Sequence, residues 1–350
     1  MLHLPRPPTE FEDEYKFLRG EDEYKSLRGE ISPSTCLRVP YLHLLFLSKI
    51  QYLNLSYANF IGRLPNQLGN LSNLLSLDLG GNDFEGGPYL HSLLLSPKSN
   101  TSVSLMPISW ARPIPPFLAS LPKIQHFILF DANFLDILPP FQNLSNLLSL
   151  DLSYNYDLNC GNLEWLSHLS SLRHLELNSV NLSKAIHWSQ AINKLPSLIH
   201  LNLRYCSLPP LTTPSFSPVN SSAPLAFLDL SDNDLTSSIY PWLFNFTTTL
   251  VHLDLSWNAH LNGSIPGIIG TMVSLTYRIC MRINYEVQFE AFGNMTSLNI
   301  LICLESITRF NSEAFGNMVS LTHQYMHDNQ LGFNSRHLGT WFLLHISVYA

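Results

Sequence analysis

The sequence has few charged residues, few cysteines and no long apolar run. Charged residues make up 13% of its 350 positions, and the acidic ones outnumber the basic ones to give a net charge of −7. A nucleic-acid interface needs a basic face, so nucleic acid is not expected as a partner. The five cysteines are an odd number with no close pair, which argues against a disulfide framework and against a zinc site.

Segments that target a protein to a membrane are not recognisable in the sequence. Residues 1–16 contain no apolar core of a secretory signal. No stretch reaches the roughly 20 apolar residues of a spanning helix, and the nearest candidate, residues 341–350, is about half that length. We therefore expect a fragment without a signal peptide, which would meet a membrane only through a segment missing from this chain.

The sequence contains an internal repeat, and 45% of its residues are hydrophobic. The segment LAFLDLSDNDL, residues 225–235, recurs as VHLDLSWNAHL, residues 251–261. Strand positions recur at intervals of 23, 25, 26, 27 and 25 residues, at Phe127, Leu150, Leu175, Leu201, Leu228 and Leu253. The pattern L-x-x-L-x-L-x-x-N at this period is typical of leucine-rich repeats, whose units bury their leucines only by stacking.

The repeat predicts an α/β solenoid, a leucine-rich-repeat horseshoe with one long parallel concave sheet and short 3₁₀ or irregular convex segments. Side chains alternate along a strand, so Leu228 and Leu230 should point into the core. Phe227, Asp229 and Ser231 should then face outward on the concave side. Return segments that carry Ile-Pro or Leu-Pro favour 3₁₀ turns, because proline fixes φ and has no N–H to pair.

Three regions are expected along the chain. Residues 1–26, which include most of a tandem duplication (EDEYKFLRG, EDEYKSLRG), should be a disordered arm. Residues 27–332 should form the solenoid, with about twelve rungs that are degenerate at 85–120 and 276–332, and residues 333–350 are an unmatched tail. The first strand is expected at Leu44–Leu47, an irregular excursion at 85–104, and a weak unit near Leu105.

Two features of single rungs follow from the same pattern. An asparagine five residues after the first strand leucine should bond the turn backbone of neighbouring rungs and form a ladder; it occurs at Asn82, Asn155, Asn233, Asn258 and Asn329. Ala58, Ala132, Val180 and Cys206 should interrupt this ladder and soften their rungs. In the degenerate region, Arg278 takes a leucine position, which predicts a distorted rung, and Cys280 and Cys303 should be neighbouring reduced core thiols rather than a disulfide.

The repeats resemble those of plant-type leucine-rich-repeat proteins. The segment RLPNQLGNLSNLLSLDLGGN, residues 63–82, has the plant-class pattern, and residues 169–208 are similar to the ectodomains of receptor-like proteins in the group of the fungal-xylanase (EIX) receptors. The resemblance implies repeats at the extracellular face of the plasma membrane. It also implies a peptide or protein ligand, a receptor-kinase co-receptor, and a role in defence or developmental signalling without enzymatic activity.

The candidate ligand-binding residues lie on the predicted concave face. One column precedes the first strand leucine, a second lies four residues after it, and aromatic residues in such columns are typical of binding hot spots. The candidates are Tyr57, His126, Tyr154, His174, His200, Arg204, Tyr205, Phe227, His252 and Trp257. The alternative is that these are ordinary surface residues of repeats.

Other chemistry has little support in the pattern. His174 and His200 occupy adjacent rungs, but two solvent-facing histidines fall short of the three or four ligands of a zinc site, and no cofactor is expected. The acidic residues at Asp78, Asp151, Glu176, Asp229 and Asp254 follow the LxLDLS pattern on every rung and should stay exposed to water and salt, so catalysis is not expected.

Nine N-x-S/T sequons offer glycosylation candidates. Asn100 and Asn220 lie in predicted loops, and the other candidates are Asn70, Asn143, Asn181, Asn245, Asn262 and Asn294. Asn54 lies between strand leucines and is a poor acceptor. Besides the receptor-like ectodomain, the sequence leaves two alternatives open: an anchor-less inhibitor or scaffold of the polygalacturonase-inhibitor type, and a non-functional truncated paralogue.

Overall fold

The computed structural model describes most of the repeat region. The described residues are 37–38, 49–84, 113–137, 141–211, 224–261, 272–281, 286–288, 300–304, 307–310, 323–327 and 330–333. The predicted arm at 1–26, residues 334–350 of the predicted tail, and the strand expected at Leu44–Leu47 lie outside them, as do the excursion expected at 85–104 and Asn329 of the predicted ladder.

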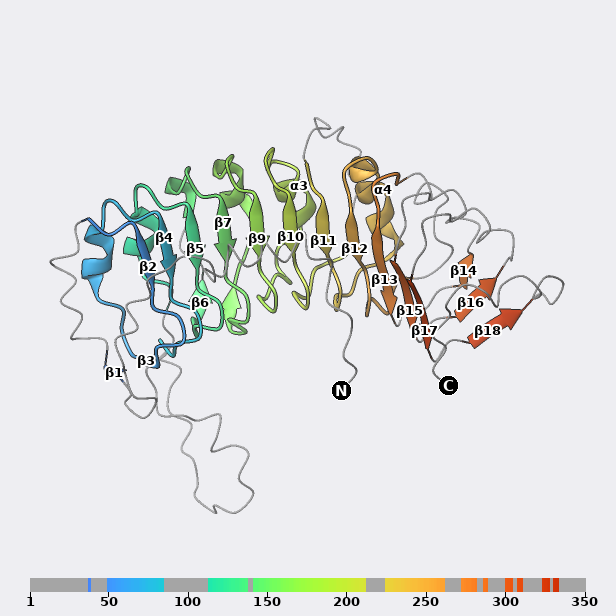
Figure 1. Ribbon diagram of the computed structural model, residues 1–350, viewed down its shortest axis with the longest axis horizontal. Coiled ribbons are helices and arrows are strands. Elements are labelled where there is room, and N and C mark those ends of the chain that lie inside the picture. The colour runs from blue at the N-terminus through green and yellow to red at the C-terminus, as the bar shows by residue number, and fades with distance from the viewer. Residues whose placement is uncertain are drawn as a thin grey trace, which may run out of the picture. The chain divides into compact units, whose positions relative to one another are not determined.

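A single open parallel sheet organises the described residues, as predicted for a leucine-rich-repeat solenoid. It has 11 strands in the order β17-β15-β13-β12-β11-β10-β9-β7-β5-β4-β2, and they lie side by side from blue to red in Figure 1. Their bounds are β2 Tyr52–Asn54, β4 Ser76–Asp78, β5 His126–Ile128, β7 Ser149–Asp151, β9 His174–Glu176, β10 His200–Asn202, β11 Phe227–Asp229, β12 His252–Asp254, β13 Tyr277–Met281, β15 Ile300–Leu304 and β17 His323–His327.

The strand leucines stand in one file inside the protein. Leu150 pairs with Leu175, Leu175 with Leu201, and Leu201 with Leu228, which pairs in turn with Leu253. All five side chains are fully buried. Each contributes roughly 1.5–3 kcal/mol by leaving water, so the periodic leucines that predicted the fold also hold it together.

The sheet is continuous across the longest interruption of the repeat. Leu77 of β4 pairs directly with Phe127 of β5, although they are about twice the usual interval apart in sequence. No strand lies between β4 and β5 in the sheet. Leu105, where the weak unit was expected to begin, lies outside the described residues, and Ile114 and Leu118 of the same predicted unit are fully buried.

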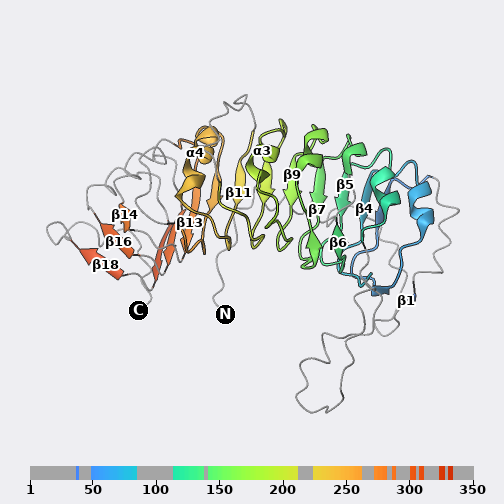
Figure 2. The same ribbon diagram turned by 180° about the vertical axis from the view of Figure 1, so that it is seen from behind.

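Short helices form the return segments, as the proline-containing pattern predicts. The 3₁₀ helices are η3 Asn66–Asn70, η4 Pro116–Ser120, η5 Phe141–Asn143, η6 Glu164–His168, η7 Ser237–Ile239 and η8 Phe244–Phe246, and two short α-helices are α3 Trp188–Ile192 and α4 Tyr240–Leu243. They lie on one face of the sheet (Figures 1 and 2). Trp188 and Trp242 join two of these returns, with ring centroids 5.2 Å apart and an edge-to-face geometry. Among the described residues, no helix is both long and apolar enough to cross a membrane.

Smaller parallel sheets join some of the return segments. β1 Leu37–Arg38 pairs with β3 Phe60–Ile61, and β6 Asp136–Ile137 pairs with β8 Leu158–Asn159. A sheet of three strands has β16 Ile307–Phe310 between β14 Glu286–Gln288 and β18 Gln330–Phe333. Backbone groups outside the main sheet thus also find partners on the next repeat.

The predicted asparagine ladder is present at each described position. Asn233 is representative: its Oδ1 accepts from the N–H groups of Cys206 and Leu208, and its Nδ2 donates to the carbonyls of Leu203 at 2.9 Å and Leu230 at 3.0 Å. Asn82, Asn155 and Asn258 make the equivalent bonds to the preceding rung.

Cys206 interrupts the ladder less than predicted. Its Sγ donates to the carbonyl of Leu177 on the preceding rung at 3.0 Å and to that of Arg204 at 3.3 Å. The thiol therefore replaces part of the donor role of asparagine but supplies no acceptor for the preceding rung. Cys206 is buried and free.

The degenerate C-terminal repeats continue the sheet in register. Arg278 pairs with Leu253, and Cys280 pairs with Cys303. The backbone distortion predicted at Arg278 is not seen in this pairing, because main-chain hydrogen bonds depend on strand geometry and not on the side chain. Cys280 and Cys303 do occupy the same position on neighbouring strands, while their side chains lie outside the described part of the structure.

Candidate functional site

The face of the main sheet without the short helices is the face predicted to be concave, and we call it the open face. It carries the first and third residues of each strand together with the turn that follows. Every candidate ligand residue named above lies on it, and register places His126, Ser149, His174, His200, Phe227 and His252 in one column.

Aromatic rings stack along this column. Phe227 lies parallel to His200 with ring centroids 4.1 Å apart, and to His252 with centroids 4.2 Å apart. His174 extends the row at 5.9 Å from His200. Adjacent parallel strands are roughly 4.8 Å apart, so rings at the same position come close enough to stack. Residues predicted as separate surface groups thus form one continuous row.

His200 is not the solvent-facing side chain that was predicted. It is only 8% exposed and its Nε2 lies 2.6 Å from Oε1 of Glu176, which is itself 9% exposed. Asn178 Nδ2 donates to the other oxygen of Glu176 at 3.1 Å. The row shields the pair from water, because each ring covers the next. Buried polar groups need hydrogen-bond partners, and Glu176 and His200 provide them for each other across the neighbouring strands β9 and β10.

The other histidines of the row are kept neutral by their surroundings. Burial lowers the pKa of His174 to about 4, and the neighbouring His200 adds to the fall. Burial likewise lowers the pKa of His252 to about 3. Desolvation disfavours the charged imidazolium, so His174 and His252 carry no charge at neutral pH. Among the described residues, no three His, Cys, Asp or Glu side chains are grouped to hold a metal ion.

A row of carboxylates runs beside the rings, and it is less exposed than predicted. Asp151 pairs with Glu176, and Asp229 with Asp254, in the strand register, with Asn202 between the two pairs. Glu176 and Asp254 are buried. The prediction of exposed carboxylates was wrong because neighbouring rungs cover the third strand position as well as the second.

Local hydrogen bonds explain why aspartate recurs in this row. The Asp151 carboxylate accepts from the N–H of Ser153 at 2.9 Å, and Asp229 accepts in the same way from Ser231 at 2.8 Å. Such side-chain-to-backbone bonds favour aspartate where a strand ends in a turn. They do not offset the loss of water: burial, with the nearby Glu176 carboxylate, raises the pKa of Asp151 to about 7.

The second predicted column projects from the turns into solvent. Tyr57 and Tyr205 are 64% and 62% exposed, and Tyr154 and Trp257 are each 37% exposed. All four residues have a left-handed backbone, with φ between 52° and 61°. We call Tyr57, Tyr154, Tyr205 and Trp257 the aromatic column. A non-glycine residue in this region costs of order 1–3 kcal/mol, so each ring is displayed at a cost in stability.

Gly81 shows what the same turn position looks like without a side chain. Its φ is +63°, and the ring of Tyr57 lies against it, so that a Cβ on Gly81 would be 2.3 Å from Tyr57 Cδ1. Glycine has no steric penalty at positive φ. The left-handed turn was not predicted from the sequence, although a glycine directly before the ladder asparagine Asn82 was a signal for it.

Arg204 adds a cation to the open face, but an ion pair occupies it. Its Nη2 lies 2.9 Å from Oδ2 of Asp232 on the next rung. Half of the Arg204 side chain is exposed, so the pair contributes at most about 1 kcal/mol. Arg204 remains reachable from solvent beside Tyr205.

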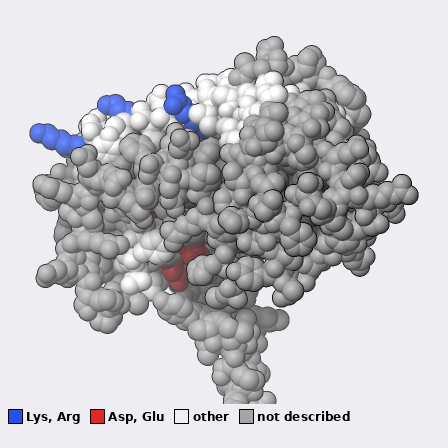
Figure 3. All heavy atoms as spheres, turned by 45° about the vertical axis from the view of Figure 1, so that its right-hand side comes forward, with Lys and Arg blue, Asp and Glu red and all other residues white. Residues whose placement is uncertain are grey.

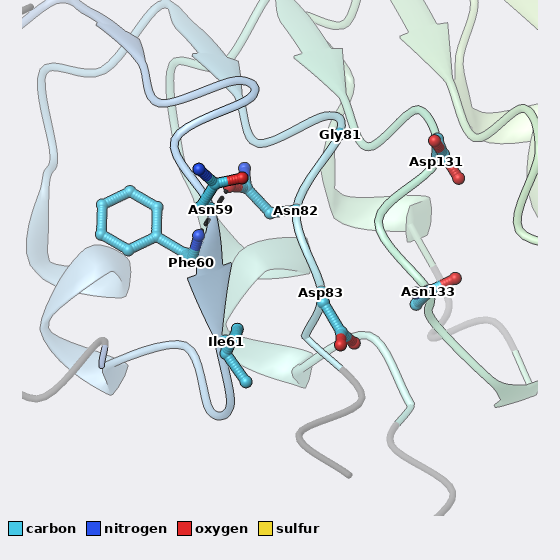
Figure 4. Close-up of a pocket in the computed structure, with 8 residues that line it drawn as sticks. All are labelled: Asn59, Phe60, Ile61, Gly81, Asn82, Asp83, Asp131 and Asn133. Atoms are coloured by element: carbon cyan, nitrogen blue, oxygen red, sulfur yellow. Dashed lines mark hydrogen bonds between the residues drawn. The ribbon is translucent and has the colours of Figure 1, made fainter. Parts of the chain in front are cut away.

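A polar pocket that the sequence analysis did not predict lies below the N-terminal strands. It has a volume of about 210 Å³ and is lined by Asn59, Phe60, Ile61, Gly81, Asn82, Asp83, Asp131 and Asn133, as Figure 4 shows. Its Asn82 is already committed to the ladder through a 3.0 Å bond from the N–H of Phe60. Asp83 and Asp131 are the acidic residues in the lining, and the described part of the chain contains no group of three His, Cys, Asp or Glu side chains that could hold a metal ion.

The predicted glycosylation sites fall away from the open face where the structure describes them. Asn70 and Asn143 are exposed at the ends of η3 and η5. Asn181 is exposed but its Oδ1 accepts from Ser183, and Asn245 has a buried Nδ2. Asn100, Asn220, Asn262 and Asn294 lie outside the described residues.

The repeats are similar in sequence to those of plant proteins. Residues 49–71 and 224–246 match the Leucine Rich Repeat family. Receptor-like protein EIX1 of Solanum lycopersicum is 41% identical over 167 residues, which is 47% of this chain and 16% of EIX1. The chain therefore spans about a sixth of the length of this curated relative.

Solved structures with the same fold come from plants and bacteria. An internalin, InlF of Listeria monocytogenes, aligns with a TM-score of 0.56 and 19% identity over 82% of this chain and 77% of its own. The ectodomain of the receptor kinase GASSHO1/SCHENGEN3 from Arabidopsis thaliana, solved with Casparian strip integrity factor 2, aligns with a TM-score of 0.53 and 19% identity over 81% of this chain and 33% of its own. With its single parallel sheet the chain has the fold of a leucine-rich-repeat solenoid, and 47% of the chain is similar in sequence to the plant receptor-like protein EIX1.

Proposed function

We propose that this chain is a non-enzymatic recognition module whose open face binds a peptide or protein ligand. The observation that carries the proposal is the aromatic column, whose side chains project from the turns into solvent. Exposed aromatic residues dominate binding energy at protein interfaces. The candidates remain Tyr57, His126, Tyr154, His174, His200, Arg204, Tyr205, Phe227, His252 and Trp257.

The setting of this recognition is also part of the proposal. The similarity to EIX1 supports an ectodomain of a receptor-like protein at the extracellular face of the plasma membrane, acting in defence or developmental signalling with a receptor-kinase co-receptor. Glycans on Asn70 and Asn143 would leave the open face accessible, because both residues lie at the ends of return helices.

A library experiment tests the open face directly. The full chain is screened against random 12-residue peptides, and binders are measured by fluorescence anisotropy with matched variants. Tyr205→Ala and Trp257→Ala should each weaken binding at least tenfold, as expected of hot-spot residues. Ile186→Ala removes an equally exposed apolar side chain from the helix side and should change binding less than twofold. Binders that respond to Ile186→Ala and ignore the aromatic column would contradict the proposal.

A further inference from the structure

One glycosylation sequon lies on the open face itself. Residues 54–56 read Asn-Leu-Ser, which fits the N-x-S/T acceptor pattern, and Asn54 is the last residue of β2. Its position between two strand leucines argues against modification, but Asn54 is exposed, with Leu53 buried and Leu55 half-buried on either side. Asn54 follows Tyr52 by two residues, so both side chains point to the same face of the strand. The side chain of Asn54 is therefore accessible from solvent on the open face.

Hydrogen bonds fix the orientation of the Asn54 amide. Its Oδ1 accepts from the N–H of Ser56 at 2.9 Å and from the hydroxyl of Ser56 at 2.7 Å. A backbone N–H only donates, so the amide atom that faces it is the oxygen and not the nitrogen. The Ser56 hydroxyl is also within reach of Asp78 on β4, where burial raises the pKa of the carboxyl and hydrogen bonds from Gly80 and Ser56 partly offset the rise. Nδ2 of Asn54, the atom that a glycan would join, makes no hydrogen bond to the described residues.

Two other described sequons show what an acceptor amide needs. Asn181 has the same arrangement, since its Oδ1 accepts from the N–H of Ser183 at 3.0 Å and from its hydroxyl at 2.7 Å. Asn181 pairs with Asn159 at the small sheet of β6 and β8, however, and not on the open face. Asn245 is the opposite case, because its Nδ2 is buried. A sugar there would displace close-packed neighbours, whereas the exposed Asn54 has room for one.

The end of the main sheet at β2 has little charge to protect it. Among the described residues, β2 pairs in this sheet with β4 alone, and the three residues of β2 carry no charge. Natural edge strands are commonly blunted by charged side chains. In the view of Figure 3, Lys and Arg atoms of the described residues appear along the upper edge and Asp and Glu atoms in one recess, so charge is sparse on the described surface. A bulky, solubilising glycan would protect β2 as charged side chains protect other edges.

A glycan on Asn54 would cover one end of the aromatic column and leave the other end open. Tyr57, which is 64% exposed, follows Asn54 by three residues, and three residues span at most about 11 Å. Tyr52, which is 50% exposed, is closer still in sequence. The strands before Tyr205 and Trp257, β10 and β12, lie five and seven steps from β2 in the sheet, which is about 24 Å and 34 Å at the usual spacing. The glycan would therefore reach Tyr52 and Tyr57 and leave Tyr205 and Trp257 open to a ligand.

We propose that Asn54 carries an N-linked oligosaccharide, which covers Tyr52 and Tyr57 and confines the ligand to the part of the open face around Tyr205 and Trp257. The inference rests on the proposed function, because this modification takes place on the secretory route to the extracellular face. The donor is a lipid-diphosphate-linked oligosaccharide. Nδ2 forms a bond to the anomeric carbon of the donor, the bond between that carbon and the diphosphate oxygen breaks, the lipid diphosphate leaves, and Nδ2 loses one proton.

Peptide mapping of the secreted full chain tests the modification. The chain is expressed behind a secretion signal in plant cells, and its glycans are released enzymatically in heavy-oxygen water, which labels each asparagine that carried one. The tryptic peptide of residues 50–63 contains the Asn54 sequon and no other, and most copies should carry the label. Ser56→Ala keeps Asn54 but removes the sequon and should abolish the label, whereas Ser56→Thr keeps the sequon and should retain it. Asn245 should be unlabelled in the folded, secreted protein, because its Nδ2 is buried.

Tyrosine nitration of the folded chain tests the cover over the rings. Tetranitromethane reacts with exposed tyrosine rings, and mass spectrometry gives the rate at each one. Tyr52 and Tyr57 should react about tenfold more slowly in the glycosylated wild type than in Ser56→Ala, because a bulky glycan lies over them. Tyr205, which is 62% exposed, should react equally in the two proteins, and an equal rate also shows that both are folded.

Separate results decide this inference and the function on which it rests. An unlabelled Asn54 in the folded, secreted chain would refute the modification. A labelled Asn54 with equal nitration of Tyr57 in the wild type and in Ser56→Ala would refute the cover. Library binders of the glycosylated chain that depend on Tyr57 as strongly as on Tyr205 would refute the confinement of the ligand. If the library yields no binder, the recognition function fails and the confinement with it, while mapping and nitration still decide the glycan.

Discussion

Truncation of one ladder asparagine should loosen two rungs at once. Asn233 is 4% exposed and accepts from Cys206 N at 3.1 Å and Leu208 N at 3.0 Å, while its Nδ2 donates to three carbonyls. Asn233→Ala leaves these two buried N–H groups without their acceptor. Each unsatisfied buried group costs about 1–3 kcal/mol, so we expect a loss of about 3–5 kcal/mol. Because repeat stability sums local and nearest-neighbour terms, the loss should concentrate around β10 and β11.

Hydrogen exchange measured by mass spectrometry provides the local assay. Amides of peptides that contain Cys206 and Leu208 should exchange roughly a hundredfold faster in Asn233→Ala, as a loss of about 3 kcal/mol implies. Asn233→Asp keeps an acceptor for both N–H groups and should fall between the variant and the wild type. The control Asn146→Ala removes an exposed amide with one bond to the Pro122 carbonyl and should leave exchange unchanged. Exchange at Cys206 that changes less than threefold in Asn233→Ala would refute the ladder as a stabilising element.

Three further predictions concern strain and charge on the open face. Gly81→Ala should lower the urea midpoint of unfolding by the equivalent of at least 1 kcal/mol, because the φ of Gly81 is positive and the new Cβ would meet the Tyr57 ring. An unchanged or higher midpoint would contradict the left-handed turn. Asp151 has a folded pKa of about 7 against 3.8 unfolded, so its stabilising contribution is present below pH 3.8 and lost as the pH rises through 7. Asp151→Asn should therefore be more stable than wild type at pH 8, by about 2 kcal/mol after allowance for partial exposure, and equal to it at pH 3.5 in urea titrations. His252 has a folded pKa of about 3 against 6.5 unfolded, so the free energy of unfolding falls by about 1.4 kcal/mol per pH unit as the pH drops from 6.5 toward 3. His252→Gln should remove this contribution from the pH dependence of unfolding. A pH dependence equal to that of the wild type would show that His252 is already protonated in the folded protein.

The parts of the fold that repeat were predictable from the sequence. Leu201 and Leu228 could be placed in the core because alternation along a strand and a constant interval leave no other burial for them. The role of Asn233 was predictable because it lies five residues after the first strand leucine, where backbone N–H and C=O groups of the turn need hydrogen-bond partners. The register of β13 against β12 was harder to predict, because Arg278 breaks the side-chain pattern while the main chain continues to pair.

The candidate site was predicted as a list of residues but not as an arrangement. Contacts between rungs determine the electrostatics of the site. Glu176 is hydrogen-bonded to His200, 24 positions away in sequence, and no local sequence pattern predicts that pair. The partial burial of Asp151 was missed for the same reason, since its cover comes from neighbouring strands. The exposure of Tyr205 and Trp257 was predicted, whereas their left-handed backbone was not, because the pattern of side chains does not report φ.

The direct pairing of β4 with β5 has a consequence for how such a chain can evolve. The two strands pair in register although an additional repeat length of sequence connects them. Pairing at this boundary therefore does not depend on the length of the connecting segment. Loop closure costs only about 0.6 kcal/mol per doubling of length. Between residues 84 and 113, therefore, insertions and deletions can accumulate, and a foreign domain or an affinity tag could be grafted, without shifting any rung on either side.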